Sequence, residues 1–398
     1  MRMRWGDHHP PDGGSPAGGG AAGGGPVGGP GGGKGAPGGV GVTRFALASH
    51  ACARFEPPGP GRRDCSAYRF DVRYVVFGAG AIGGTIGANL AEHGHDVVLI
   101  ARGAHRDALA ARGLEVRSPD RTSISEIPVV DRPGALALDD DDDVVVLAVK
   151  SQDTTAALDA LRGATSKAVP LVCAQNGIAN ERAALRRFRD VYAMCVMLPA
   201  VHLEPGVVIA HGTPLAGILD VGRYPSGVDA RAERIAADLD SSGFSSRARP
   251  DVMRFKHTKL LMNLANAFQA ACGDDPGWGE LYTAARAEAI ACYEAAGIDF
   301  ASDDEDRERR GDLVQLRPVG GQRHQGGSSW QSLARGTGSI ETDYLNGEIV
   351  LLGRLHGVPT PANELAQRVA NRLAAGRVPP GSVPAADLVD EWTAAARA

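Results

Sequence analysis

The sequence predicts an α/β protein in which a doubly wound, mostly parallel sheet is followed by a second domain made of helices. Three observations predict this fold class. A glycine-rich motif lies between an apolar strand and a helical pattern, further apolar strands alternate with helical segments, and apolar helices fill the last third of the chain. We therefore expect a Gly/Pro-rich tail over residues 1–70, a sheet domain over residues 71–249 and a helical domain over residues 250–398.

The composition argues against several classes of protein. A formal net charge of −5 offers no electrostatic attraction for nucleic acid or for an anionic membrane surface. No apolar run approaches the roughly 18 residues that a membrane helix needs. The six cysteines are scattered without C-x-x-C spacing, and most lie in apolar runs. This pattern favours reduced thiols in the core of a cytoplasmic protein over disulfides or a metal site.

Residues 1–70 are predicted not to fold. They are rich in Gly, Pro and Ala and have almost no apolar periodicity, so they cannot bury enough surface to offset the entropy lost on ordering. They also lack the positively charged start and apolar core of a secretory signal, and the amphipathic pattern of a transit peptide. We interpret this segment as a disordered tail.

Residues 74–84 carry the motif on which the sheet domain is organised. An apolar run leads into G-x-G-x-x-G, and a helical pattern follows. In this motif Gly78 permits the sharp turn, Gly80 lets a pyrophosphate approach the backbone, and Gly83 lets the helix pack close to the strand. The free N–H groups at the start of the helix would face the phosphates. The remaining residues of the predicted dinucleotide site are Ala79, Ala81 and Ile82. A purely structural turn in some other α/β protein is the alternative.

The end of the second strand distinguishes between two forms of the dinucleotide. The strand predicted over residues 97–101 is followed by Arg102, and no carboxylate stands where an NAD site would hold the ribose 2′-hydroxyl. A cation at this place suits the 2′-phosphate of NADP. We therefore predict NADP over NAD, with a solvated loop cation as the alternative role of Arg102.

Two charged runs are predicted to be solvated. The carboxylates of residues 139–143 could suggest a metal site, but consecutive residues rarely converge on one ion. Residues 303–312 are interpreted as a solvated helix or loop, and the segment from Pro379 as a loosely packed C-terminal tail. No metal site is predicted.

Polar side chains follow the next two strands. The strand predicted over residues 144–149 leads to Lys150, and the strand predicted over residues 169–174 leads to Asn176. Ligands of open α/β sheets bind outside the carboxyl ends of the strands. The glycine turn, Lys150 and Asn176 should therefore share one edge of the sheet, and a turn or surface role is the alternative.

The helix predicted over residues 251–272 carries a polar stripe. Its members recur at spacings of 3, 4 and 3, which places them on one face of a helix: Lys256, Lys259, Asn263 and Asn266. Arginine far outnumbers lysine in this chain, and lysine differs from arginine in that a buried ammonium can release its proton near neutral pH. Lysine with asparagine suits a cleft that binds a polar substrate and donates a proton. The wet face of a surface helix is the alternative.

Further along the chain, a polar loop and a carboxylate complete the candidates. The loop contains Ser328 and Ser329, and Glu341 stands at the start of another apolar helix. A carboxylate in the first turn also complements the helix dipole, so capping is the alternative role of Glu341.

Taken in order, these motifs resemble the ketopantoate reductase (2-dehydropantoate 2-reductase) family over about residues 72–375. The resemblance rests on the glycine motif, the arginine after the second strand, Val149-Lys150, Gln175-Asn176-Gly177, Lys259-x-x-x-Asn263, the Ser-Ser loop and residues 341–347. It implies a Rossmann-type sheet domain followed by an all-helical domain related to that of 6-phosphogluconate dehydrogenase. The active site would lie in the cleft between the two.

The resemblance also implies roles for individual residues. Lys259 resembles the catalytic lysine of the family, and Asn176 and Asn263 resemble residues that hold the substrate and the nicotinamide. Lys150 matches a lysine on the cofactor side, and Glu341 matches the carboxylate that orients the site next to the cofactor.

The chain departs from the family pattern at a few positions. The substrate-binding serine falls on Ser328 or Ser329, and both stay open. An asparagine expected eight residues after the lysine is Ala267, with Asn266 one position early, and Trp330 stands where the family often has methionine. These departures put the identity of the substrate in question more than the chemistry.

The implied activity is the reduction of 2-dehydropantoate to pantoate with NADPH, a step of pantothenate and coenzyme A biosynthesis. Lys259 would hydrogen-bond the carbonyl oxygen and supply the proton. The alternatives are a reductase of another branched or bulky 2-keto acid, an opine-type dehydrogenase that condenses an amine with the keto acid, and a non-catalytic NADP-binding sensor. The expected partner is a small 2-keto acid, and the oligomeric state stays open, a homodimer included.

Overall fold

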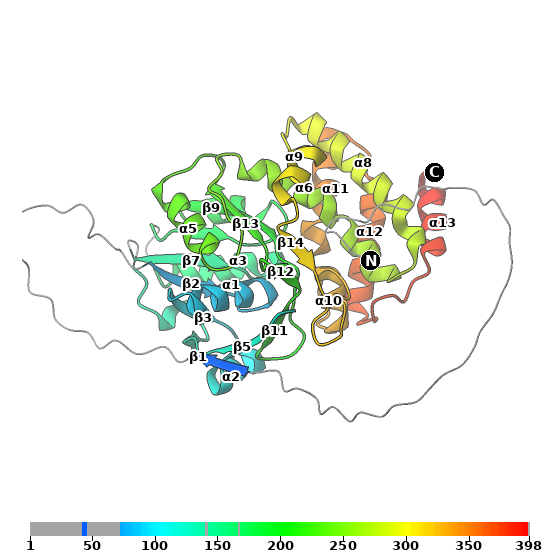
Figure 1. Ribbon diagram of the computed structural model, residues 1–398. Coiled ribbons are helices and arrows are strands. Elements are labelled where there is room, and N and C mark those ends of the chain that lie inside the picture. The colour runs from blue at the N-terminus through cyan, green and yellow to red at the C-terminus, as the bar shows by residue number, and fades with distance from the viewer. Residues whose placement is uncertain (1–41, 46–71, 140–141, 166–167, 397–398) are drawn as a thin grey trace, which may run out of the picture.

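The computed structural model describes residues 42–45, 72–139, 142–165 and 168–396. A sheet domain and a helical domain lie side by side in it, with a short strand pair between them (Figure 1).

A seven-stranded sheet with the order β13-β9-β8-β7-β2-β3-β6 forms the centre of the first domain. Its strands are β2 (Arg73–Phe77), β3 (Asp96–Ile100), β6 (Val129–Val130), β7 (Asp143–Leu147), β8 (Leu171–Cys173), β9 (Val191–Met197) and β13 (Ile218–Arg223). All neighbouring strands are parallel except β13, which pairs antiparallel with β9 at one edge. The chain runs outward in one direction from β2 and in the other from β7, so the strand order reverses between them. Ligands of doubly wound sheets bind at such a reversal.

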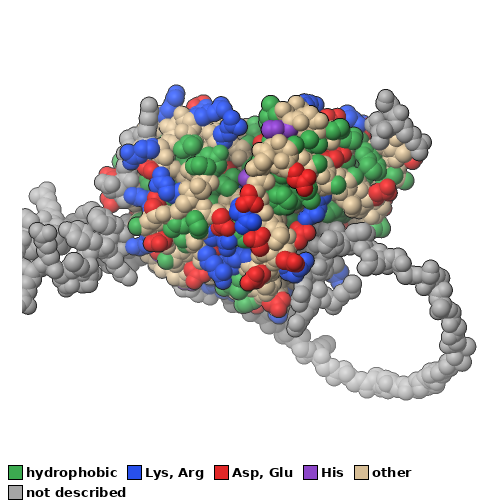
Figure 2. All heavy atoms as spheres, turned by 90° about the horizontal axis from the view of Figure 1, so that it is seen from above, with side chains coloured by type: hydrophobic (Ala, Val, Ile, Leu, Met, Phe, Trp, Pro, Cys, Tyr) green, Lys and Arg blue, Asp and Glu red, His purple; other side chains and the backbone are tan. Residues whose placement is uncertain are grey.

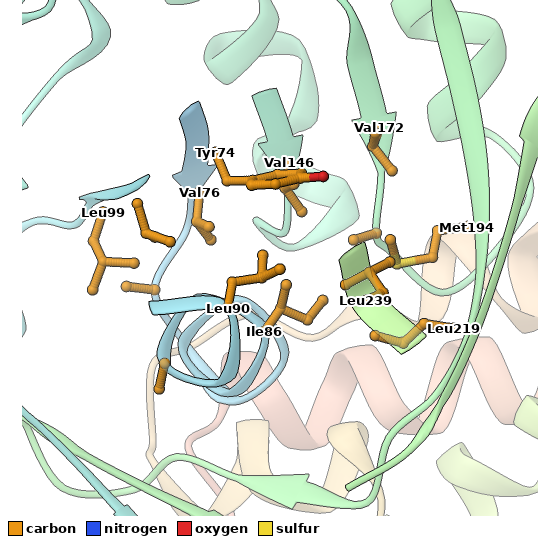
Figure 3. Close-up of a cluster of buried hydrophobic side chains, with 14 of the residues drawn as sticks. Tyr74, Val76, Ile86, Leu90, Leu99, Val146, Val172, Met194, Leu219 and Leu239 are labelled. Atoms are coloured by element: carbon orange, nitrogen blue, oxygen red, sulfur yellow. The ribbon is translucent and has the colours of Figure 1, made fainter. Parts of the chain in front are cut away.

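Helices cover both faces of this sheet. Tyr74 and Val76 of β2 face α1 (Ala81–Glu92) and α5 (Ala230–Asp240), whereas the alternate residues Val75 and Phe77 face α3 (Thr154–Arg162) and α4 (Asn180–Leu185). Figure 3 shows the first of these layers, in which Tyr74 and Val76 lie above Ile86 and Leu90 of α1. Burial on both faces explains why the strands are apolar throughout, and the predicted doubly wound sheet is confirmed.

A smaller sheet with the order β1-β5-β4-β11-β10 shares the core of α1. Its strands are β1 (Val42–Phe45), β4 (Leu114–Arg117), β5 (Thr122–Ser125), β10 (Ala200–Val201) and β11 (Val207–Ala210), and α2 (Gly103–Arg112) precedes β4. Strands β10 and β11 pair antiparallel, so the chain between them forms a hairpin. Strand β1 pairs in parallel with β5, so the expectation of an unfolded tail is wrong for these four residues. All other residues of the segment 1–70 lie outside the described residues.

The second domain consists mainly of helices, as predicted. They are α6 (Val252–Asn263), α7 (Ala265–Cys272), α8 (Gly279–Ala296), α9 (Asp303–Arg310), α10 (Ser328–Ala334), α11 (Asn346–His356), α12 (Pro361–Ala375) and α13 (Ala385–Ala396). The single helix expected over residues 251–272 is divided at Leu264 into α6 and α7. The C-terminal segment is not loose, because α13 buries Ala385 and Leu388 in the core of this domain.

The two domains are joined by backbone pairing and by apolar packing. Strand β12 (Gly212–Pro214) of the first domain pairs antiparallel with β14 (Val314–Leu316) of the second. Nearby, Val252 and Phe255 of α6 share a buried cluster with residues of β9 and β13. The strand β14 also means that the second domain is not entirely helical.

Two charged runs that were expected to be solvated each contain a buried side chain that forms an ion pair with another element. Asp143 accepts hydrogen bonds of 2.7 Å from both Nε and Nη2 of Arg73, at the start of neighbouring strands. On α9, Arg309 donates to both carboxylate oxygens of Asp220, at 2.6 and 2.5 Å, and both side chains are buried. The prediction of solvent exposure is therefore wrong for Asp143 and for Arg309, because each has an opposite charge on another element.

Surface charge is mixed on the face seen in Figure 2, where basic side chains adjoin acidic ones. Within the described residues, no helix is both long and apolar enough to cross a membrane. In the same part of the chain, no group of three or more His, Cys, Asp or Glu side chains could hold a metal ion.

Candidate active site

The glycine turn has the geometry that its motif predicts. Gly78 adopts a φ of +104°, and a Cβ on Gly83 would lie only 2.1 Å from the carbonyl oxygen of Gly78. By contrast, a Cβ on Gly80, at the N-terminus of α1, would meet no atom within 4 Å. The turn is thus closely packed at Gly83 and open at Gly80. The free N–H groups of Ala81 and Ile82 lie in the first turn of the helix that follows. Space and donors both fit a dinucleotide pyrophosphate.

A histidine that the sequence did not single out fixes this turn to its neighbours. His105 on α2 donates from Nε2 to the carbonyl oxygen of Ala79 at 2.7 Å, and its Nδ1 accepts the backbone N–H of Gly206 at 2.9 Å. Because Nδ1 accepts, the ring is neutral, and burial lowers the pKa of His105. Arg102 caps the same helix and its side chain is exposed beside this turn.

At the carboxyl edge of the sheet, one carboxylate of the helical domain is hydrogen-bonded by groups of the sheet domain. Glu341 of the helical domain accepts hydrogen bonds from the backbone N–H and the hydroxyl of Ser151, at 2.9 and 2.7 Å. Its second oxygen accepts one from Nζ of Lys150 at 3.2 Å. Glu341 is 3% exposed. Its contacts lie with the sheet domain, so its function goes beyond that of a helix cap.

A second layer of hydrogen bonds connects this carboxylate to the segment that carries Asn176. Asn180 donates to the hydroxyl of Ser151 at 3.0 Å and to the carbonyl oxygen of Asn176 at 3.1 Å. The side-chain oxygen Oδ1 of Asn180 accepts a hydrogen bond from the hydroxyl of Thr154 at 2.8 Å. Lys150 and Asn176 therefore lie at one edge, as expected, and Glu341 lies with them. Ser151 and Asn180 were missed, although Ser151 directly follows Lys150 and Asn180 stands four residues after Asn176.

Lys259 lies on α6 and is 8% exposed. Burial lowers the pKa of Lys259 to about 8, while the nearby Cys195 and Asp306 act in the opposite direction. One turn further, Asn263 is also buried, and its Nδ2 has no hydrogen-bond partner among the described residues. The wet-face alternative for this part of the stripe is thus excluded. An amide donor buried without a partner is costly, which indicates a place for a ligand oxygen.

The serine loop adjoins the end of this stripe. Helix α10 begins with Ser328 and Ser329, and both hydroxyls are buried without a partner among the described residues. The residue before them, Gly327, packs so closely on Asn266 that an added Cβ would lie 2.9 Å from its Oδ1. Both serines therefore stay candidates, and Asn266 lies beside their loop.

The two departures that raised the question of substrate are both packing residues here. Trp330 packs on the core of the helical domain and lies against Gly326, where a Cβ would be 2.6 Å from the indole. Ala267 is 2% exposed within the same core. Both residues therefore have packing contacts with the core of the helical domain.

Lys256, the first member of the polar stripe, has a different environment from the others. Its ammonium lies 2.7 Å from a carboxylate oxygen of Glu181 and donates to the carbonyl oxygens of Gln175 and Met194. The ammonium of Lys256 therefore interacts with groups of the sheet domain.

The structure thus combines an open glycine turn, at the reversal of a Rossmann-type sheet, with a buried lysine and carboxylate on the adjoining helical domain. These features define a two-domain oxidoreductase that uses a nicotinamide cofactor. Comparison with known families agrees in both halves. Residues 74–226 match the family described as "Ketopantoate reductase PanE/ApbA", and residues 251–374 match the description "Ketopantoate reductase PanE/ApbA C terminal". The chain belongs to the ketopantoate reductase family, and the family predicted from the sequence is confirmed.

Individual relatives give the same result. A 2-dehydropantoate 2-reductase of Mesorhizobium japonicum is 28% identical over 340 residues, which are 77% of this chain and 99% of that protein. One from Pyrococcus horikoshii is 30% identical over 194 residues, but the match spans only 62% of that protein and 49% of this chain. Among solved structures, a PanE/ApbA family ketopantoate reductase from Ralstonia eutropha aligns with a TM-score of 0.65 at 27% identity, over 77% of this chain and 99% of the other.

Proposed function

We propose that this chain reduces 2-dehydropantoate to pantoate with NADPH, the activity for which its relatives are named. The observation that carries the proposal is the buried Lys259 ammonium on a helix whose Asn263 amide has no protein partner among the described residues. A carboxylate oxygen of a substrate could accept a hydrogen bond from the Asn263 amide, and its carbonyl oxygen would be placed next to the Lys259 ammonium. Four cysteines of the described residues are buried and free, which supports a reducing, cytoplasmic setting.

The residues at the edge of the sheet fit a bound NADPH. The backbone N–H groups around Gly80 would hold the pyrophosphate, with Ala79, Ala81 and Ile82 in the same turn, and Arg102 would face the 2′-phosphate. Lys150 and Glu341 would lie on the nicotinamide side. When bound, the cofactor supplies a hydride; the protein contributes position and electrostatics.

The proposed chemistry of the chain is a proton transfer. The Lys259 ammonium hydrogen-bonds the carbonyl oxygen of the keto acid and gives it a proton as negative charge develops there. General acid catalysis of this kind contributes typically ~10²–10⁴-fold in rate. Asn263 and Asn176 donate to the substrate's oxygens, and the remaining proposed contacts are Asn266, Ser328 and Ser329.

The test is NADPH oxidation by the purified chain with 2-dehydropantoate, followed at 340 nm. Turnover with this substrate, and a higher kcat/KM than with a panel of other branched or aromatic 2-keto acids, is the expected result. Faster turnover of a panel member would assign the chain to that substrate. Oxidation that requires an added amine would reveal an opine-type dehydrogenase, and cofactor binding without any turnover would support a sensor.

The pH dependence of this activity should follow Lys259. Reduction needs the ammonium form, and burial lowers the pKa of Lys259 to about 8. We therefore expect kcat/KM of reduction to be level below this pH and to fall about tenfold per unit above it, since kcat/KM reports the free enzyme. The measurement is kcat/KM between pH 6 and pH 10, with the NADPH Kd measured alongside. An activity that rises through this range would contradict the assignment.

Cofactor choice should depend on Arg102. In the Arg102→Asp variant we expect NADPH binding to weaken by about 10- to 100-fold, because hydrogen bonds to charged groups contribute about 1.5–3 kcal/mol. NADH binding should improve, since a carboxylate can hold the ribose 2′-hydroxyl. Titration of both cofactors by fluorescence measures the change, with Arg162→Asp, an exposed arginine at the far end of α3, as the matched control. An unchanged preference would remove Arg102 from the site.

A further inference from the structure

Lys256 is a buried cation that donates two hydrogen bonds and forms one ion pair within the protein. The residue is 3% exposed, and its Nζ donates to the carbonyl oxygen of Gln175 at 2.8 Å and to that of Met194 at 3.1 Å. A carboxylate oxygen of Glu181 lies 2.7 Å away. Glu181 is 0% exposed, so each member of the pair supplies the charge that the other requires in a buried position.

The chemistry of this site requires lysine rather than arginine. An ammonium has three N–H donors at one point, and three protein oxygens lie around Nζ of Lys256, two as hydrogen-bond acceptors and one as the counter-charge. A guanidinium is planar and larger, and its five donors could not converge on the same three oxygens. This geometry explains a lysine in a chain that otherwise uses mostly arginine.

One of the oxygens around Nζ of Lys256 belongs to the segment that carries Asn176, a proposed active-site residue. Gln175 directly precedes Asn176, and its side-chain amide donates to the carbonyl oxygen of Val149, the residue before Lys150. Met194 lies in β9, on which α6 packs, and Lys259 follows Lys256 by three residues on the same helix. A single ammonium thus connects the segment after β8 and the middle of β9 to the helix of the proposed catalytic lysine.

We propose that Lys256, paired with Glu181, is a positioning residue that holds the Asn176 segment at a fixed distance from the Lys259 helix. The inference rests on the function proposed above and concerns a residue that does not itself contact the substrate. Misplacing a substrate-holding group by about 1 Å can cost about 10²-fold in rate. Lys256 would therefore influence keto-acid binding and turnover through Asn176.

The experiment removes both charges at once, because Lys256→Met alone would leave Glu181 buried without a counter-charge and could fail to fold. In the double variant Lys256→Met/Glu181→Gln we expect kcat/KM for the keto acid to fall by about 10²-fold, while the Kd of NADPH changes by less than about threefold. The single variant Lys256→Arg should also have a lower kcat/KM than the wild type, because the guanidinium does not fit the site of the ammonium. Full activity in the Lys256→Arg variant would overturn the proposal.

A double-mutant cycle with Asn176→Ala distinguishes positioning from a general loss of stability. If Lys256 acts through Asn176, the charge-pair variant should cost little further kcat/KM once Asn176 has been replaced. Fully multiplicative losses would overturn the proposal. The matched control is Arg73→Met/Asp143→Asn, which neutralises an ion pair at the opposite edge of the same sheet and should leave the KM of the keto acid unchanged.

A measurement without turnover keeps this inference separate from the proposed function. Hydrogen exchange of the backbone amides of residues 174–181 should accelerate at least about tenfold in Lys256→Met/Glu181→Gln, and should not change in the Arg73/Asp143 control. Unchanged exchange in this segment would overturn the positioning role even if the chain reduced no keto acid. Accelerated exchange in a chain that lacks keto-acid turnover would instead reject the proposed function alone.

Discussion

Replacing Lys259 by alanine is expected to lower kcat for keto-acid reduction by about 10²–10⁴-fold, the usual contribution of a general acid. The side chain lies on α6 of the helical domain, whereas the proposed pyrophosphate contacts are made by the turn before α1, so the Kd of NADPH should stay close to that of the wild type. Steady-state kinetics with saturating NADPH and a fluorescence titration of the cofactor measure the two quantities.

Lys259→Arg provides the control for charge. A guanidinium keeps the positive charge but does not release its proton near neutral pH, so this variant should retain substrate binding better than turnover. A near-normal kcat in Lys259→Ala would refute the assignment of this residue as the acid.

Replacing Asp220 by alanine is expected to destabilise the protein by about 3–5 kcal/mol, which is the usual result of removing one partner from a buried ion pair. Asp220 accepts two hydrogen bonds from Arg309 and one from the backbone N–H of Arg247 at 3.0 Å. In the variant the Arg309 guanidinium would stay buried without a counter-charge. The free energy of unfolding from urea titration measures the loss.

The double variant Asp220→Leu/Arg309→Met tests the cause of this loss. It removes both charges and keeps similar volumes, so most of the stability should return. A loss equal to that of Asp220→Ala would indicate that the shape of the interface, rather than the unpaired charge, is responsible.

The parts of the fold that could be predicted from the sequence are those in which neighbouring residues determine the structure. The turn at Gly78 and the close approach at Gly83 follow from the spacing of the motif and the strand before it. Strands that are buried on both faces can be recognised in the sequence as continuous apolar runs. The division of the long helix at Leu264 was not visible, because the apolar pattern continues through it.

The charged residues show where such reasoning ends. Asp143 and Arg309 stand in runs of charge that look solvated, yet their partners lie 70 and 89 residues away in the sequence. Pairing at that distance depends on the register of strands and on the docking of the second domain, neither of which a local pattern contains. The same limit hid the ion pair between Lys256 and Glu181.

The candidate site was predicted better than its supports. Lys150 and Asn176 were expected at one edge of the sheet, and hydrogen bonds through Ser151 and Asn180 connect them to Glu341. These two supporting residues have small polar side chains, which are common in loops and carry little signal. Their role follows only once the strand ends are placed in space.

The strand pair β12–β14 bears on whether the halves of this chain can exist apart. Fragments cut near residue 250 would each expose an unpaired strand, and the buried charges Asp220 and Arg309 would be divided between them. Such fragments should precipitate when expressed singly and reassemble when expressed together, which would make the chain suitable for split-protein complementation.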